Sequence, residues 1–155
     1  MLPCLWGNKK YIVIAIDHYT RWIEATIVTK ETSQSIMGFI EQDILMRHGC
    51  PKWIQTDGSK LYVLSEINGF FAKKKIAHEV SAFYHPESNG MAERLIQSLK
   101  DSLSHVNEEQ EFDFRRNLNV AVSAYRMVPH CATSFLPFVL LYGPKALTPY
   151  EIPFT

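Results

Sequence analysis

The stretch YIVIAIDHYTRWIEATIV, residues 11–28, decides the fold of this chain. It holds two runs rich in β-branched residues, 11–17 and 21–28, on either side of His18, Tyr19 and Thr20. Such runs are typical of strands, and a short connection between two of them is typical of a hairpin. The stretch therefore predicts a β-hairpin near the N-terminus.

Downstream of the hairpin, helical and extended patterns alternate. Thr32 or Ser33 can cap a helix that runs to about residue 48, and Gly49 and Pro51 follow it as stop signals. The apolar period then changes between about 3.6 and about 2 residues. It predicts strands over residues 53–57 and 76–81 and helices over residues 65–74, 91–103, 112–127 and 136–142. This alternation predicts an α/β sheet flanked by helices.

Size and composition fit one globular domain that is not exported. The chain has 155 residues, of which 46% are hydrophobic and 21% charged, and its formal net charge is zero. A chain of this length buries roughly two-thirds of its unfolded surface. No apolar run approaches the roughly 20 residues of a membrane span, and the N-terminus lacks the order of a secretory signal. We therefore expect no membrane partner and a nuclear or cytoplasmic protein that is not secreted.

Cysteine usage argues against a disulfide framework and against zinc. Cys4, Cys50 and Cys131 are odd in number and widely spaced, and no CxxC pair occurs. Secreted disulfide scaffolds and zinc clusters both need paired cysteines at short spacings. We expect a reducing compartment and no zinc.

Asp57 and Glu93 are the first candidate site residues. Thirty-five residues separate them; Asp57 ends a predicted strand, and Glu93 opens a predicted helix. Carboxylates from two elements can hold a divalent cation such as Mg²⁺, which prefers a few carboxylate oxygens together with water and phosphate oxygens. Two ordinary interpretations stay open: Asp57 before Gly58 can be a turn aspartate, and Glu93 can simply interact with the helix dipole. Asp17, at the tip of the hairpin, has the same ambiguity as Asp57.

Several polar and basic residues are candidates for contacts with nucleic acid. Gln97 and Lys100 follow Glu93 at positions i+4 and i+7, so the three share one face of the predicted helix. A basic run that could contact phosphates comprises Lys73, Lys74 and Lys75. The alternative is that both sets are ordinary solvated surface, which the zero net charge favours.

Three phrases resemble the catalytic core of retroviral and Ty3/gypsy-type integrases. They are TDGSK around Asp57, FYHPESNGMAERLIQSLK around Glu93, and AYRMVPHCATSFLPFVLLYG near the end, in the family's order and at similar separations. The hairpin phrase YIVIAIDHYTRWIEA also looks like the family's second and third strands. The resemblance covers residues 11–149, which leaves residues 1–10 as a linker and residues 150–155 as a tail. It implies an RNase H-like mixed sheet flanked by helices.

The resemblance also implies an activity and assigns roles to residues. The family carries out DNA integration by 3′-end processing and strand transfer, with an Asp-Asp-Glu triad and two Mg²⁺ or Mn²⁺ ions. Asp57 matches the second carboxylate and Glu93 the third, and both would be metal ligands. Lys100 stands where the family has a lysine that contacts viral-end DNA. Integrase cores dimerise through helices, so the apolar face of the predicted helix over residues 112–127 is a candidate homodimer surface.

The chain departs from the family at the first catalytic aspartate. In the family that residue lies on the first strand, upstream of the hairpin, whereas residues 1–10 contain no acid. We therefore expect a sheet that lacks the family's first strand, and Asp17, on a later strand, is a poor substitute ligand. A smaller departure is that Gly58 follows Asp57 directly, where the family usually has one residue between them. Two hypotheses remain: an integrase core with impaired or lost catalysis, and a non-enzymatic domesticated domain that binds DNA or protein.

Overall fold

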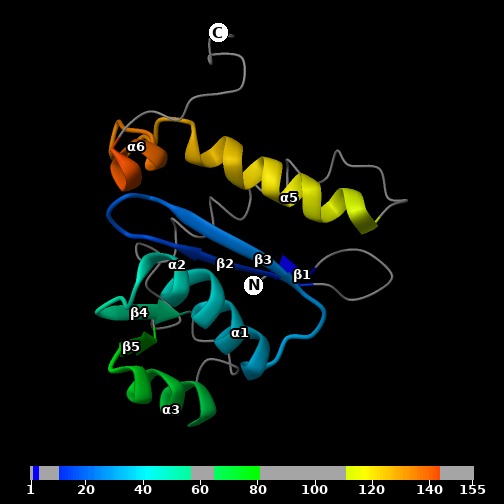
Figure 1. Ribbon diagram of the computed structural model, residues 1–155, viewed down its shortest axis with the longest axis vertical. Coiled ribbons are helices and arrows are strands. Elements are labelled where there is room, and N and C mark those ends of the chain that lie inside the picture. The colour runs from blue at the N-terminus through cyan, green and yellow to red at the C-terminus, as the bar shows by residue number, and fades with distance from the viewer. Residues whose placement is uncertain (1, 4–10, 57–64, 81–110, 144–155) are drawn as a thin grey trace, which may run out of the picture. The chain divides into compact units, whose positions relative to one another are not determined.

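The computed structural model of the chain describes residues 2–3, 11–56, 65–80 and 111–143 (Figure 1). Its internal contacts divide the chain into two compact units. The first unit comprises residues 1–14 and 26–100, and the second comprises residues 15–25 and 101–155. The predicted hairpin contributes to both units, because its tip, residues 15–25, belongs to the second.

The hairpin predicted from the sequence is confirmed. Strand β2 spans Tyr11–Ile16 and strand β3 spans Ile23–Val28, and the two are hydrogen-bonded neighbours in one sheet. The amide of Asp17 donates to the carbonyl of Trp22 over 2.8 Å and closes the turn between them. The two strands are therefore consecutive in the sequence and neighbours in the sheet, as the two β-branched runs indicate.

A short third strand precedes the hairpin. Strand β1, Leu2–Pro3, pairs antiparallel with β2, so the sheet has the order β1-β2-β3. Leu2 lies opposite Ile12, and Pro3 lies opposite Tyr11. The expected linker over residues 1–10 is thus corrected at residues 2–3, which form a strand. Two residues are too few to show the period-2 pattern that reveals a strand, and their pairing is dictated by the neighbouring strand.

The helix predicted to start at Thr32 or Ser33 is confirmed, but it is not α-helical throughout. It consists of α1, Ser33–Phe39, then a π-helical segment η1, Ile40–Leu45, and then α2, Met46–His48. Thr32 is the N-cap, and its hydroxyl accepts a hydrogen bond from the amide of Ser35 over 3.2 Å. Gly49 ends the helix with φ of 83°, a conformation that glycine adopts at little cost. The capping and stop signals therefore bounded this helix correctly.

A second sheet is built from two parallel strands joined by a helix. Strand β4 spans Trp53–Thr56, helix α3 spans Ser65–Lys74, and strand β5 spans Ala77–Val80. The register places Trp53 opposite Ala77 and Thr56 opposite Val80. A strand, a helix and a parallel strand form a βαβ unit, which is typical of α/β folds. The strand, helix and strand predicted over this part of the chain are confirmed. Each strand end that the structure describes lies within one residue of its predicted position.

The core of the first unit lies among the hairpin, α1, α3 and β5. Its buried side chains are aliphatic or aromatic and are each at most 5% exposed: Ile12, Val13, Ile36, Phe39, Ile40, Ile67, Phe71 and Ile76. Helices α1 and α3 contact each other directly. Their first turns are joined by a hydrogen bond from the hydroxyl of Ser33 to the carboxylate of Glu66. This contact places a negative charge beside the N-terminus of α1, where the helix dipole favours it.

The second unit contains two helices and the hairpin tip. Helix α5 spans Glu111–Arg126, and helix α6 spans Pro137–Tyr142, which confirms both predicted helices. Helix α5 buries Leu118 and Val122, one turn apart, and the hairpin tip buries Trp22 and Ile23. Burial of residues at i and i+4 is the pattern of a helix with one apolar face. Among the described residues, no helix is long and apolar enough to cross a membrane.

Candidate functional site

Strand β4 leads directly to the first candidate metal ligand. Its last residue is Thr56, and Asp57 follows Thr56 in the sequence. Asp57 itself lies outside the described residues, as do three other predicted site residues, Glu93, Gln97 and Lys100. The structure does describe the end of β4, which Asp57 follows in the sequence, and the side chains that contact that strand end.

The side chain of His78 joins that strand end to helix α3. Its Nε2 lies 2.9 Å from the hydroxyl oxygen of Thr56, and its Nδ1 lies 2.8 Å from the amide oxygen of Asn68. The imidazole also packs against the ring of Phe71, with centroids 4.5 Å apart and planes inclined by 34°. Burial lowers the pKa of His78 from its ordinary value. The imidazole of His78 is therefore neutral at neutral pH. This residue and its three neighbours are here called the His78 network, which comprises Thr56, Asn68, Phe71 and His78.

The chemistry of the neighbours sets the proton positions in the His78 network. The amide oxygen of Asn68 can only accept, so Nδ1 of His78 carries the hydrogen and donates it. In the neutral ring, Nε2 then accepts a hydrogen bond from the hydroxyl of Thr56. The sequence analysis did not single out His78. A signal was present in the strand pattern, because Thr56 and His78 share one face of two neighbouring parallel strands.

Asp17 is engaged in its own turn. Its Oδ2 accepts hydrogen bonds from the amide and the hydroxyl of Thr20, both over 2.7 Å. Its carbonyl accepts from the amide of Arg21 over 3.0 Å, and Arg21 has a positive φ of 64°. These are the local bonds of a turn aspartate. They agree with the expectation that Asp17 is a poor substitute for a catalytic carboxylate.

The basic run at the end of α3 is exposed, and one of its members is ion-paired. All three residues, Lys73, Lys74 and Lys75, are exposed. The Nζ of Lys74 lies 2.7 Å from a carboxylate oxygen of Glu41 in η1. Both side chains of this pair are about two-fifths exposed, so the pair is solvent-screened and can open toward another anion. Among the described residues, the structure shows no ion pair for Lys73 or Lys75.

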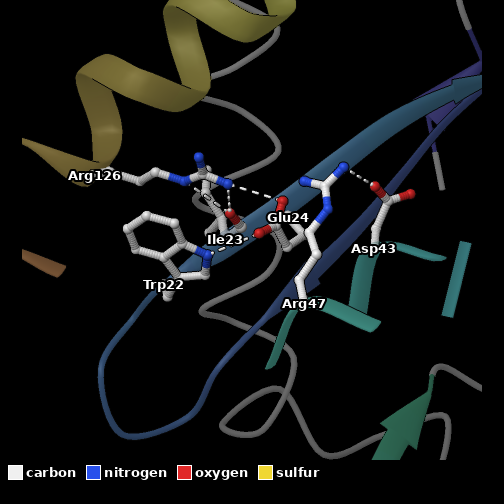
Figure 2. A network of polar contacts seen from close by, with 6 residues as sticks. All are labelled: Trp22, Ile23, Glu24, Asp43, Arg47 and Arg126. Carbon is white, nitrogen blue, oxygen red and sulfur yellow. Dashed lines mark hydrogen bonds and ion pairs between the residues drawn. The ribbon is translucent and has the colours of Figure 1, made fainter. Parts of the chain in front are cut away.

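A buried acidic network that the sequence did not reveal holds the hairpin tip to α5 (Figure 2). Glu24 is 6% exposed; its Oε1 accepts from the indole of Trp22 over 3.0 Å, and its Oε2 lies 2.9 Å from Nη2 of Arg126. The same Nη2 donates to the carbonyl of Ile23 over 2.6 Å, and the guanidinium carbon lies 3.9 Å from the centroid of the Trp22 ring. These four residues, the Glu24 network, satisfy a buried carboxylate with charged and neutral donors. These contacts offset the cost of burying the charge of Glu24.

The exposed side of α5 carries an open groove. Its volume is about 880 Å³, and the described residues that line it are Arg115, Arg116, Asn119, Val120, Ser123, Ala124 and Met127. Val120 is 59% exposed and Met127 39%. The apolar face that was predicted as a homodimer surface buries Leu118 and Val122, whereas the opposite side of the helix exposes Val120.

Among the described residues, no group of three or more His, Cys, Asp or Glu side chains could hold a metal ion. The predicted ligands Asp57 and Glu93 lie outside these residues. Their chemistry suits a hard divalent cation, because both are carboxylates. Within the described residues, the network nearest to Asp57 in sequence is the His78 network.

Comparison with known proteins identifies relatives among retroviral polyproteins. The chain is 28% identical over 139 residues to the Gag-Pol polyprotein of avian reticuloendotheliosis virus, which covers 90% of the chain and 12% of the polyprotein. It is 28% identical over 151 residues to the Gag-Pol polyprotein of koala retrovirus, covering 97% of the chain and 8% of the polyprotein. The chain thus spans only a small part of the length of the polyproteins it matches.

Solved structures and a family model give the same relationship. The fold is similar to a chain of the simian T-cell lymphotropic virus intasome in complex with the PP2A regulatory subunit B56 gamma, with a TM-score of 0.75, 21% identity, and coverage of 99% of this chain and 55% of that one. It is also similar to the catalytic core domain of BIV integrase, with a TM-score of 0.70, 21% identity and 90% coverage of both chains. These neighbours confirm the predicted RNase H-like α/β fold. The family model for the integrase core domain matches residues 1–86, more than half of the chain. The chain therefore belongs to the integrase core domain family and is a catalytic core of the retroviral type.

Proposed function

We propose that this chain acts in DNA integration, by metal-dependent 3′-end processing and strand transfer, as one segment of a longer Pol-type product. The observation that carries the proposal is the match of the integrase core domain model to residues 1–86, a span that includes Asp57. The spacing from Asp57 to Glu93 inside integrase-like phrases supports it. Its partner is DNA, and its compartment is intracellular, nuclear or cytoplasmic.

In this reaction the chain supplies ligands and positions the DNA. Asp57 and Glu93 would hold a Mg²⁺ or Mn²⁺ ion through their carboxylate oxygens. Such an ion, when bound, activates the attacking water or 3′-hydroxyl and stabilises the leaving oxygen of an in-line displacement. Gln97 and Lys100, on the same predicted helix as Glu93, would contact the DNA end. Lys73 and Lys75 would contact its phosphates, with Lys74 available when its pair with Glu41 opens.

We further propose that the 155-residue chain by itself catalyses this reaction poorly. Residues 1–10 contain no acid to serve as the first carboxylate. Asp17 accepts two hydrogen bonds within its own turn and is not available without breaking them. Two cations facing two carboxylates would lack charge compensation, so metal binding and catalysis should both be weaker than in an intact triad.

A strand-transfer assay with short DNA ends tests this proposal. We expect Mn²⁺-dependent joining at a low level, which Asp57→Asn and Glu93→Gln abolish. Asp17→Asn is the matched control, because it removes one negative charge while keeping an oxygen that accepts from Thr20. Joining by the Asp57→Asn protein at the level of the unchanged chain would overturn the assignment.

A second candidate function is non-enzymatic DNA or protein binding by a domesticated domain. It is favoured by the exposure of Lys73, Lys74 and Lys75. Replacing all three lysines by glutamine should lower nonspecific DNA affinity and make its salt dependence shallower. DNA binding that persists in the Asp57→Asn protein, with no joining by the unchanged chain, would favour this candidate.

The exposed side of α5 is the surface we propose for a homodimer. Val120, which is 59% exposed on that side, is a suitable probe. Val120→Glu should convert a dimer to a monomer, because it buries an unpaired charge at the contact. Sedimentation of the unchanged chain and the variant measures this, and an identical mass for both would contradict it.

A further inference from the structure

The His78 network lies where the β4 ladder ends. Strand β4 has four residues, and its backbone pairing with β5 ends with Thr56 opposite Val80. Ile54 is the residue opposite His78, so the hydroxyl of Thr56 reaches the imidazole diagonally across the two strands. Terminal residues of short strands open readily unless a side chain ties them down. The link from Thr56 to His78 is such a tie.

Helix α3 fixes the imidazole from its other side. Asn68 and Phe71 are three residues apart on α3 and therefore lie on one face of the helix. Asn68 accepts from Nδ1 of His78 over 2.8 Å, and the ring of Phe71, 1% exposed, packs against the imidazole. The ring can neither rotate nor tilt without losing one of these contacts. A continuous chain of contacts therefore runs from the buried core, through His78, to the last residue of β4.

We propose that His78 is a positioning residue, which fixes the end of β4 at Thr56 and thereby sets the point from which Asp57 follows. This inference rests on the proposed function, in which Asp57 is a metal ligand. It adds His78 as a residue that would act through Asp57 and would not itself contact metal or DNA. Positioning matters here because a displacement of about 1 Å at a reacting centre can cost about a hundredfold in rate.

Two pairs of substitutions separate positioning from simple packing. Thr56→Val removes the hydroxyl and keeps the shape, whereas Thr56→Ser keeps the hydroxyl. His78→Asn retains a donor near the place of Nδ1 but cannot reach Thr56, whereas His78→Gln retains an acceptor near the place of Nε2. Ile67→Val is the control for stability, because Ile67 is fully buried on α3, so the change loosens the core and leaves all four residues of the His78 network unchanged.

The first readout is amide hydrogen exchange at residues 56 and 57 in the full chain, with exchange at buried residues of α3 as reference. Thr56→Val and His78→Asn should speed exchange at residues 56 and 57 by about fivefold or more relative to α3, the ratio expected for one lost hydrogen bond. Thr56→Ser and His78→Gln should change that ratio by less than about twofold. Ile67→Val should speed exchange throughout the unit and leave the ratio unchanged. An unchanged ratio in Thr56→Val would overturn the proposal.

The second readout is Mn²⁺ binding by the same proteins, measured by electron paramagnetic resonance. Thr56→Val should weaken it, and Thr56→Ser should restore it. If the unchanged chain binds Mn²⁺ no better than Asp57→Asn does, the proposed function fails, while hydrogen exchange still decides whether His78 fixes the strand end. If Thr56→Val weakens binding no more than Ile67→Val does at matched stability, His78 is a packing residue and the proposal fails.

Discussion

Asp17 follows β2 at the hairpin turn. It lies at the end of a strand, as Asp57 was predicted to, but its Oδ2 accepts two hydrogen bonds from Thr20. We expect Asp17→Ala to lower the free energy of unfolding by about 1 kcal/mol for each of these bonds at most. Asp17→Asn should cost less, because its amide oxygen still accepts. Urea denaturation measures both, and equal losses would mean that the charge, not the turn, is what matters.

Two histidines should make the protein less stable in acid. Burial lowers the pKa of His78, and burial together with the nearby Arg21 lowers the pKa of His130. A lowered pKa in the folded state means that the unfolded chain takes up protons first as the pH falls. The stabilisation is therefore complete above about pH 6.5 and is lost progressively as the pH falls through the lowered values. His78→Gln should flatten the fall of unfolding free energy between about pH 7 and about pH 5; an identical slope would contradict this.

At the scale of one element, helix α3 ends on a residue that its geometry does not favour. Lys75 has φ of 58°; its amide donates to the carbonyl of Ala72, and the amide of Ile76 donates to the carbonyl of Phe71. This is a Schellman ending, in which glycine is the preferred residue. Lys75→Gly should raise the free energy of unfolding by about 0.5–1 kcal/mol. Lys75→Ala, which removes the charge but keeps Cβ, should give no such gain; an equal gain would assign the effect to charge.

The boundaries of elements were predictable where local chemistry sets them. Thr32 and Gly49 bounded the helix from α1 to α2, because a cap and a positive φ are encoded by single residues. The π-helical segment Ile40–Leu45 carries no such signal, and we have no physical account of it from the local sequence. Strand β1 was missed because Leu2–Pro3 owes its conformation to pairing with β2. The local sequence therefore predicted the helix whose ends single residues set, whereas strand β1 depends on its pairing with β2.

At the scale of the whole molecule, the least predictable feature was the contact between distant residues. Glu24 and Arg126 are 102 positions apart, and nothing in either neighbourhood marks them as partners. The candidate ligands Asp57 and Glu93 stay predictions, which depend on phrases that resemble those of a family. The contacts of His78 with Thr56 and Asn68 depend instead on how β4, β5 and α3 pack, which the local sequence does not specify.

The Glu24 network should dominate the stability of the second unit. Removing Arg126 takes away a guanidinium that lies 2.9 Å from the buried carboxylate of Glu24, and breaking a buried ion pair typically costs about 3–5 kcal/mol. We expect Arg126→Met to lose about that much unfolding free energy, and the double variant Glu24→Gln with Arg126→Met to lose less than the sum of the single losses. Lys74→Met is the control, because its pair with Glu41 over 2.7 Å is about two-fifths exposed at both side chains and should contribute under about 1 kcal/mol. Additive losses for Glu24 and Arg126 would show that the pair is not coupled.

The register of β1 specifies how a complete first strand would fit this molecule. Leu2 pairs with Ile12 and Pro3 with Tyr11, so each position upstream of Leu2 would pair one residue further along β2, as far as Ile16. An added upstream segment of alternating apolar residues should therefore extend the ladder and stabilise the protein by about 1 kcal/mol per hydrogen bond formed. An extension of the same length with Pro at alternate positions should give no such gain, because Pro lacks the amide that pairs with the neighbouring strand. Equal free energies of unfolding for the two extended proteins in urea denaturation would show that the added segment does not pair with β2.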